Sequence, residues 1–142
     1  MTLGRGILAG LFTGIIASLI VIAYNVIYRG AVDLLSYDVV MPVSIFFFFP
    51  CINLVAGGIY FLFLDHIRKG REVYIIVVLI VTALIAFFTA FNGRHNDPAL
   101  EKFRGLLLGL EVIEGCMAAF LIPFFANHPR IFLTDKDIRG EE

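Results

Sequence analysis

Apolar residues in this chain gather into four long blocks instead of recurring singly among polar ones. The blocks cover approximately residues 8–28, 41–64, 73–91 and 106–125, and most charged residues lie between them or in the tail. A block of about 20 apolar residues can cross the hydrocarbon core of a bilayer as an α-helix, because the helix satisfies its own backbone hydrogen bonds. The pattern therefore predicts an all-α integral membrane protein, a bundle of four transmembrane helices.

The composition agrees with this class. Of the 142 residues, 60% are hydrophobic and 16% are charged, whereas an ordinary soluble domain is about half apolar and about a quarter charged. The net charge is −1, and there is no basic run of the kind that follows nucleic acid. We expect the lipid bilayer and other membrane subunits, or a second copy of the chain, as partners, and no nucleic acid. No repeat divides the chain, so we expect one membrane domain over residues 1–142 with a polar tail over residues 127–142.

The positive charges predict an orientation. One side of the membrane would hold seven Lys and Arg residues and the other side four. The richer side holds Arg5, Arg68, Lys69, Arg71, Arg130, Lys136 and Arg139. Because Lys and Arg mark the cytoplasmic side, both termini are expected in the cytoplasm (N-in, C-in). The connection over residues 70–72 is short enough to join the second and third helices as a hairpin.

Small residues line one face of the first block at intervals of four residues. The members of this helix-packing ridge are Gly6, Gly10, Gly14 and Ser18. Such a ridge lets two helix backbones approach closely, so we expect it to face another helix of the chain, with self-association through it as the alternative. A second small and weakly polar stripe suited to helix contact consists of Thr82, Ala86 and Thr89.

The fourth block contains two acidic residues, which are the strongest chemical signal in the chain. Glu111 and Glu114 are three residues apart, so they share one face of a helix. A charge inside a bilayer costs from about 2.5 kcal/mol upwards, so acidic residues there face the bundle or a water-filled cavity, and they often mark ion or proton pathways. We therefore expect an ion or proton site at this pair, with Asn53 and Asn25 as neutral polar partners from facing helices.

A purely structural role for the same pair stays open. A protonated Glu side chain both donates and accepts hydrogen bonds, so each one could join two helices without binding anything. In that case Asn53 and Tyr60 are the expected partners across the helix contacts.

No other set of residues predicts catalysis or a cofactor. His66 and His128 fall at the ends of their helices, and there is no Glu-x-x-His pair of the di-iron type. Cys51 and Cys116 lie in separate apolar blocks without a Cys-x-x-Cys spacing, so we expect buried thiols. The sequence therefore predicts no catalytic residues, no metal site and no cofactor.

Several positions match an uncharacterised family of small bacterial four-helix integral membrane proteins. The residues that carry the resemblance are Gly6, Gly10, Gly14, Asn25 and Pro42. In that family the first helix starts with a Gly-x-x-x-Gly-like segment and carries an Asn near its outer end, and the second helix begins with a Pro. In that family the fourth helix also carries a polar residue, which is often His. This chain has Glu111 and Glu114 in its fourth block instead, so the resemblance there concerns the position and not the residue type. The resemblance implies a four-helix fold in a bacterial plasma (inner) membrane and no assigned activity.

Two classes of function follow from these observations. The first is a non-enzymatic accessory or structural subunit that packs in or beside a larger membrane complex, which the small size and short connections favour. The second is a transport-like protein that handles protons or cations through its Glu pair. The surroundings of Glu114 in three dimensions discriminate between the two classes.

Overall fold

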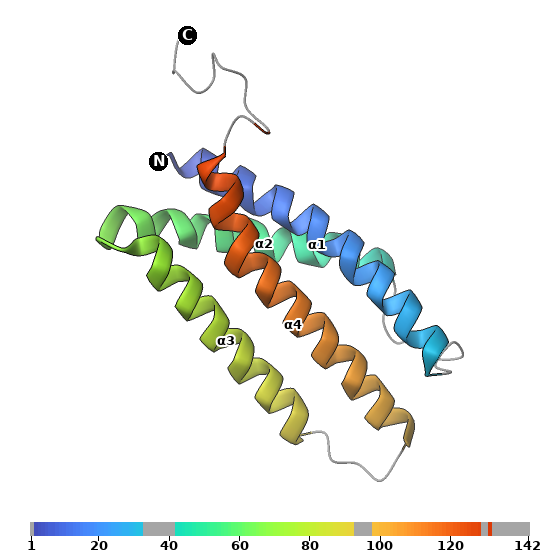
Figure 1. Cartoon of the computed structure of the whole chain (residues 1–142). Coiled ribbons are helices and arrows are strands. Elements are labelled where there is room, and N and C mark those ends of the chain that lie inside the picture. The colour runs from blue at the N-terminus through green and yellow to red at the C-terminus, as the bar shows by residue number, and fades with distance from the viewer. Residues whose placement is uncertain (1, 33–41, 93–97, 129–130, 132–142) are drawn as a thin grey trace.

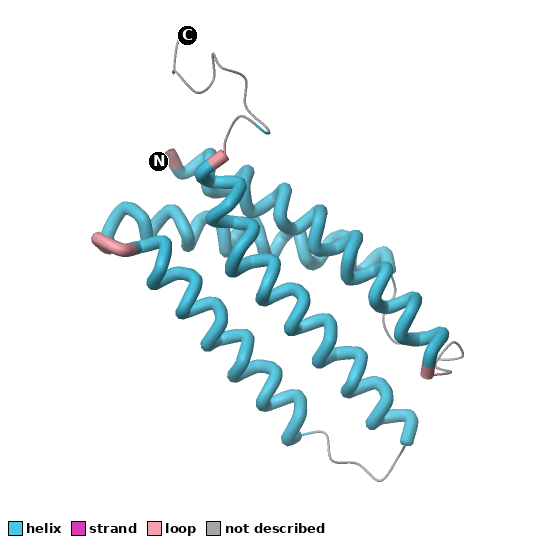
Figure 2. The backbone as a smooth tube through the Cα atoms, in the orientation of Figure 1, coloured by secondary structure: helices cyan, strands magenta, loops and turns pink. Residues whose placement is uncertain are grey.

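The computed structural model describes residues 2–32, 42–92, 98–128 and 131. These residues form four helices, α1 (Leu3–Ala31), α2 (Pro42–His66), α3 (Gly70–Asn92) and α4 (Pro98–Asn127), which follow one another as antiparallel neighbours (Figure 1; Figure 2). Each of the four is long and apolar enough to cross a membrane. The prediction of an all-α fold with four helices of membrane-spanning length is thus confirmed.

The helices extend beyond the apolar blocks that predicted them. The largest difference is at α4, which begins at Pro98 instead of near residue 106. Proline fits the first turn of a helix because the N–H that it lacks would have no helical partner there. Glu101, Lys102 and Arg104 then lie on the helix, where Arg104 lies 3.6 Å from Glu101 in an ion pair. The predicted tail lies outside the described residues except for Asn127, His128 and Ile131.

The connection between α2 and α3 lies three residues earlier than predicted. The turn consists of residues 67–69, and Gly70 already begins α3, its N–H donating to the carbonyl of Ile67 at 3.0 Å. A Cβ atom at Gly70 would overlap the carbonyl of Phe63. The glycine therefore lets the two helix ends come together, so a short hairpin forms as expected, but the placement of the turn at residues 70–72 was wrong.

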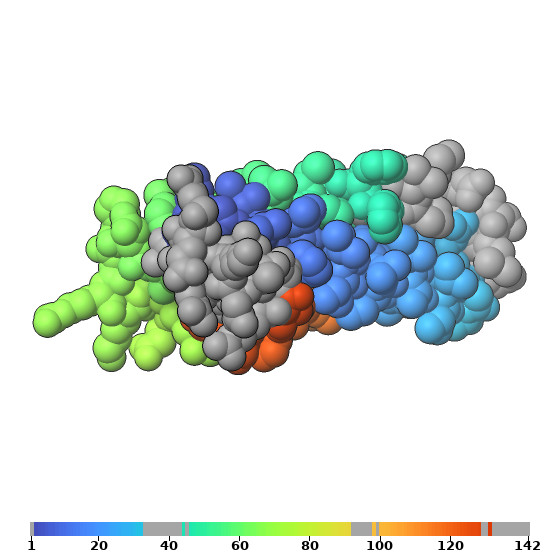
Figure 3. Space-filling view, turned by 90° about the horizontal axis from the view of Figure 1, so that it is seen from above, coloured from blue at the N-terminus to red at the C-terminus, as the bar shows by residue number. Residues whose placement is uncertain are grey.

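α1 contacts both α2 and α4, and α3 packs mainly along α4. Seen from above, α1 runs between the surfaces of α2 and α4, and the turn between α2 and α3 stands at one end of the molecule (Figure 3). Near that turn the ring of Tyr74 lies 4.9 Å from the ring of Tyr60 and 6.0 Å from the ring of Phe63. Away from the turn, α2 and α3 diverge (Figure 1).

Glycine residues bring α1 and α2 into backbone contact. A Cβ atom added to Gly10 would overlap the carbonyl of Asn53, and one added to Gly57 would overlap the carbonyl of Gly6 and lie 3.1 Å from the Cα atom of Gly10. At Gly14, an added Cβ atom would meet the backbone of Pro50. This is the close approach that small residues at four-residue spacing permit.

Candidate functional site

A groove occupies the space where α2 and α3 diverge, with α4 along its floor. Its volume is about 890 Å³. Apolar side chains make most of its surface, among them Phe47, Phe48 and Ile52 of α2 and Val81 and Ile85 of α3. Phe47 and Phe48 of α2 are exposed, whereas Gly57 of the same helix lies against the backbone of Gly6 and Gly10 on α1.

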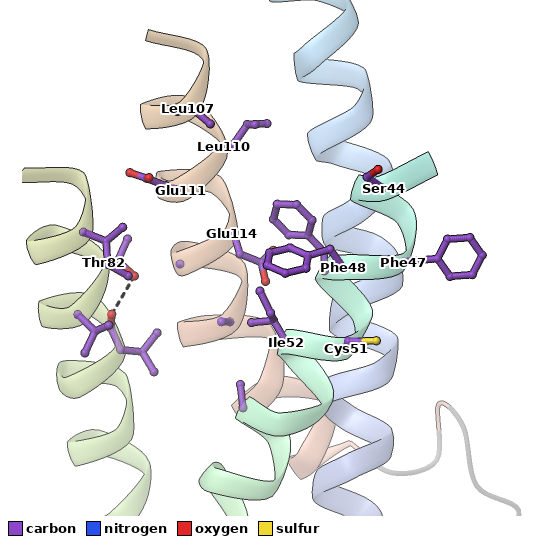
Figure 4. Close-up of a pocket in the computed structure, with 17 residues that line it drawn as sticks. Ser44, Phe47, Phe48, Cys51, Ile52, Thr82, Leu107, Leu110, Glu111 and Glu114 are labelled. Carbon is purple, nitrogen blue, oxygen red and sulfur yellow. Dashed lines mark hydrogen bonds between the residues drawn. The ribbon is translucent and has the colours of Figure 1, made fainter. Parts of the chain in front are cut away.

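Both glutamates of the predicted pair line this groove. They lie at the middle of α4, and the three-residue spacing turns their side chains to different sides: Glu111 extends toward α3 and Glu114 toward α2 (Figure 4). The pair therefore faces the interior of the bundle, as acidic residues on a membrane-spanning helix are expected to do.

Each carboxyl group accepts a hydrogen bond from a different helix. The Nδ2 amide of Asn53 on α2 donates to Oε1 of Glu114 and also, at 3.0 Å, to the carbonyl of Phe49 one turn earlier. The hydroxyl of Thr89 on α3 donates to Oε1 of Glu111 at 2.7 Å. The two glutamates thus connect α4 to both walls of the groove.

Three oxygen atoms at this site are buried without a hydrogen-bond partner among the described residues. They are Oε2 of Glu111, Oε2 of Glu114 and Oδ1 of Asn53, whose side chain is completely buried. All three are acceptors when the carboxyl groups are ionised. No Lys or Arg of the described residues lines the groove. A buried acceptor without a donor is costly, so the ionised form of this site needs a partner that carries N–H or O–H donors or a positive charge.

The other predicted members of the site lie elsewhere. Asn25 is buried on α1 and does not line the groove. Tyr60 packs against Tyr74 rather than against a glutamate. Of the helix-packing ridge, Gly6, Gly10 and Gly14 lie against α2, and Ser18 is buried with its hydroxyl donating to the carbonyl of Ile15 at 2.8 Å. That ridge supports α2 from the side opposite to the groove.

Thr89 is the site residue that the sequence did not single out as a partner of a glutamate. Thr82, Ala86 and Thr89 form the stripe that predicted a helix contact. The structure has such a contact, because Thr82 lies against Gly115 of α4. The polar character of the two threonines was the signal available, since a hydroxyl facing another helix commonly hydrogen-bonds across the contact.

The two thiols differ from expectation. Cys51 and Cys116 are both free and exposed on the surface of the bundle, so the prediction of buried thiols was wrong. Their apolar blocks are exposed on the sides that face away from the other helices, which the sequence could not show. His66 and His128 each interact with the carbonyl four residues earlier, and among the described residues no three His, Cys, Asp or Glu side chains are grouped to hold a metal ion.

Comparison of the chain with protein-family models, with curated proteins and with solved structures finds no match.

Proposed function

We propose that this chain is a multi-pass protein of a bacterial plasma (inner) membrane, with both termini in the cytoplasm, that binds a cation at its Glu pair as part of a transport-like function. Support for the membrane comes from four helices of sufficient length and apolar character. The bias of Lys and Arg toward one side supports the orientation. The bacterial origin of the membrane rests on the family resemblance alone.

One observation carries the cation site: Glu111 and Glu114 both line the groove, and each has a buried Oε2 atom without a donor among the described residues. An ionised carboxyl group away from water needs a positive partner. A cation in the groove would supply that partner to both glutamates, and Thr89 and Asn53 would hold the carboxyl groups in place.

Thermal unfolding of the full chain in lipid nanodiscs tests this proposal. A cation that binds only the folded protein raises Tm, and the rise grows with the logarithm of the free concentration once this exceeds Kd. We expect such a rise for at least one member of a panel of metal, ammonium and organic ammonium ions. The rise should be lost in the double variant Glu111→Gln, Glu114→Gln and kept in Glu101→Gln, which changes an exposed glutamate of the same helix. If no cation of any size raises Tm in a manner that depends on the two glutamates, the proposal is rejected.

A non-enzymatic accessory or structural subunit is the second candidate, because each glutamate already joins α4 to a neighbouring helix through Asn53 or Thr89. In that case the hydrogen bonds alone are the role of the pair, and the chain would pack beside a larger membrane complex. Purification of the native chain in mild detergent, followed by native mass spectrometry, would then reveal stoichiometric partner subunits. The same partners should be retained when Gln replaces both glutamates, since an amide still accepts a hydrogen bond.

The orientation has its own test. Lys69 lies in the exposed turn between α2 and α3. In a chain with Cys51 and Cys116 changed to Ala, Lys69→Cys should react with a membrane-impermeant maleimide only after the cells are opened. Labelling of intact cells would reverse the proposed topology.

A further inference from the structure

The walls of the groove restrict which cation it can hold. Phe47 is 69% exposed and Val81 is 47% exposed, so the walls of the groove face the surroundings of the protein. In the proposed membrane location these surroundings are lipid acyl chains. Aromatic and aliphatic walls cannot replace the water shell of a small metal ion. They can cover an apolar molecule, and a volume of about 890 Å³ lies in the range of sites for small organic ligands.

The length of the groove restricts its occupant further. At the turn end, α2 and α3 are closed against each other by the rings of Tyr60, Phe63 and Tyr74, with Tyr74 buried. A helix that crosses the whole membrane needs a slot along the full length of its neighbours. This groove runs along only part of α2 and α3, so it fits a small molecule better than a partner helix.

The free acceptors indicate the head group. Oε2 of Glu111, Oε2 of Glu114 and Oδ1 of Asn53 lack donors among the described residues. A primary ammonium group carries a positive charge and three N–H donors. It therefore supplies the charge and the donors that the two carboxyl groups of the groove lack, whereas a quaternary ammonium supplies charge alone.

We propose that the ligand of this site is an amphiphilic primary amine in its ammonium form. Its head group lies at Glu111 and Glu114, and its apolar body lies along Phe48, Ile52 and Val81. It enters sideways from the membrane between α2 and α3. This inference rests on the proposed function, because it names the class of cation that the Glu pair binds.

Equilibrium dialysis with the full chain in nanodiscs tests the inference, with empty nanodiscs as the blank. The probes are 4-phenylbutylammonium, methylammonium with the same head group but no apolar body, and 4-phenylbutanol with the same body but no charge. We expect saturable binding of 4-phenylbutylammonium, and affinity weaker by roughly tenfold or more for each of the other two, since each lacks one set of contacts.

Variants separate the groove from the glutamates. Val81→Phe fills the groove from an exposed position of α3, so it should abolish binding of 4-phenylbutylammonium while the chain stays folded. The matched control is Ile76→Phe, an exposed position of α3 that does not line the groove, and it should bind as the parent does. Glu114→Gln should weaken binding by roughly tenfold.

Any of the following outcomes would overturn the inference. Equal, Glu-dependent binding of methylammonium and 4-phenylbutylammonium would reject the amphiphile and leave the proposed cation site standing. Equal binding of 4-phenylbutanol would show an apolar pocket without cation recognition. Unchanged amine binding in Val81→Phe would place the ligand outside the groove. Displacement of the amine by a helix of a co-purified protein would show that the groove is a helix-docking site instead.

Discussion

The two sides of α2 are packed in opposite ways. Toward α1, the backbones are so close that Gly10, Gly14 and Gly57 have no room for a single added carbon. Toward α3, the helices separate and leave a groove of about 890 Å³. The difference shows that one helix can be fixed rigidly on one face so that the other face stays open, and the two glutamates of α4 lie on the open side.

Two adjacent glycines of α2 test the close packing against α1, and they should give the largest difference in stability. Gly57→Ala should destabilise the fold by about 3 kcal/mol, the upper end for overpacking, because the added carbon meets the backbone of Gly6 and Gly10 and neither can move aside. At Gly58 an added Cβ atom has nothing within 4 Å, so Gly58→Ala should change stability by less than about 1 kcal/mol. Unfolding by sodium dodecyl sulfate in mixed micelles measures both variants. Equal stability of the two would show that α1 and α2 are not in backbone contact.

Removing the carboxyl group of Glu114 tests the open side. Glu114→Leu leaves the buried Nδ2 of Asn53 with only the carbonyl of Phe49 as acceptor, so we expect a loss of about 2 kcal/mol. Glu114→Gln keeps an acceptor and should cost less than half as much. The free energy of unfolding in the same micelles measures both. A Leu variant as stable as the parent would exclude the structural connection to α2.

Gly115 gives a smaller effect on the contact between α3 and α4. The Cβ atom of Gly115→Ala would overlap the side chain of Thr82. Because a side chain can rotate whereas a backbone cannot, we expect a loss of about 1 kcal/mol, the lower end for overpacking. A second change, Thr82→Ala, should restore much of this loss if the overlap is its cause. Should the double variant be no more stable than Gly115→Ala alone, the contact between α3 and α4 is not formed by these residues.

The smallest expected effect concerns the hydroxyl of Thr89. Thr89→Val keeps the shape of the side chain and removes its hydrogen bond to Glu111. Hydrogen bonds between membrane helices contribute about 0.6 kcal/mol on average, so the loss should be of this size. The same change at Thr82, whose hydroxyl bonds to Val78 within its own helix, is the control and should cost less. A larger loss at Thr82 than at Thr89 would contradict the assignment of Thr89 to the site.

The existence of the four helices could be predicted because each forms an apolar block of membrane-spanning length. Hydropathy did not predict the ends of the helices, since polar residues such as Glu101 and Lys102 continue α4 where hydropathy alone ends it, although Pro98 is itself a signal for a helix start. The turn before α3 was misplaced for a related reason. At Gly70 an added Cβ atom would overlap the carbonyl of Phe63, and this close approach exists only after the hairpin has formed.

The candidate site was predictable in part. The spacing of Glu111 and Glu114 placed both on one helix face, and both line the groove. Which residues meet them depends on the rotation of the neighbouring helices, and a single sequence does not contain that rotation. For this reason Asn53 lies at Glu114 while Asn25 lies elsewhere, although both are buried amides on facing helices.

The unequal lengths of the helices have a consequence for the surrounding bilayer. α4 has 30 residues and α1 has 29, whereas α3 has 23. At about 1.5 Å per residue, α3 is slightly longer than a hydrocarbon core of about 30 Å, and the two longer helices exceed it by about half. Longer helices adapt to this mismatch by tilting. A thicker or thinner bilayer would therefore change the tilt of α4 more than that of α3, and so change the width of the groove between its floor and its wall. The acyl-chain length of the host lipid would in this way act as a control on access to Glu111 and Glu114.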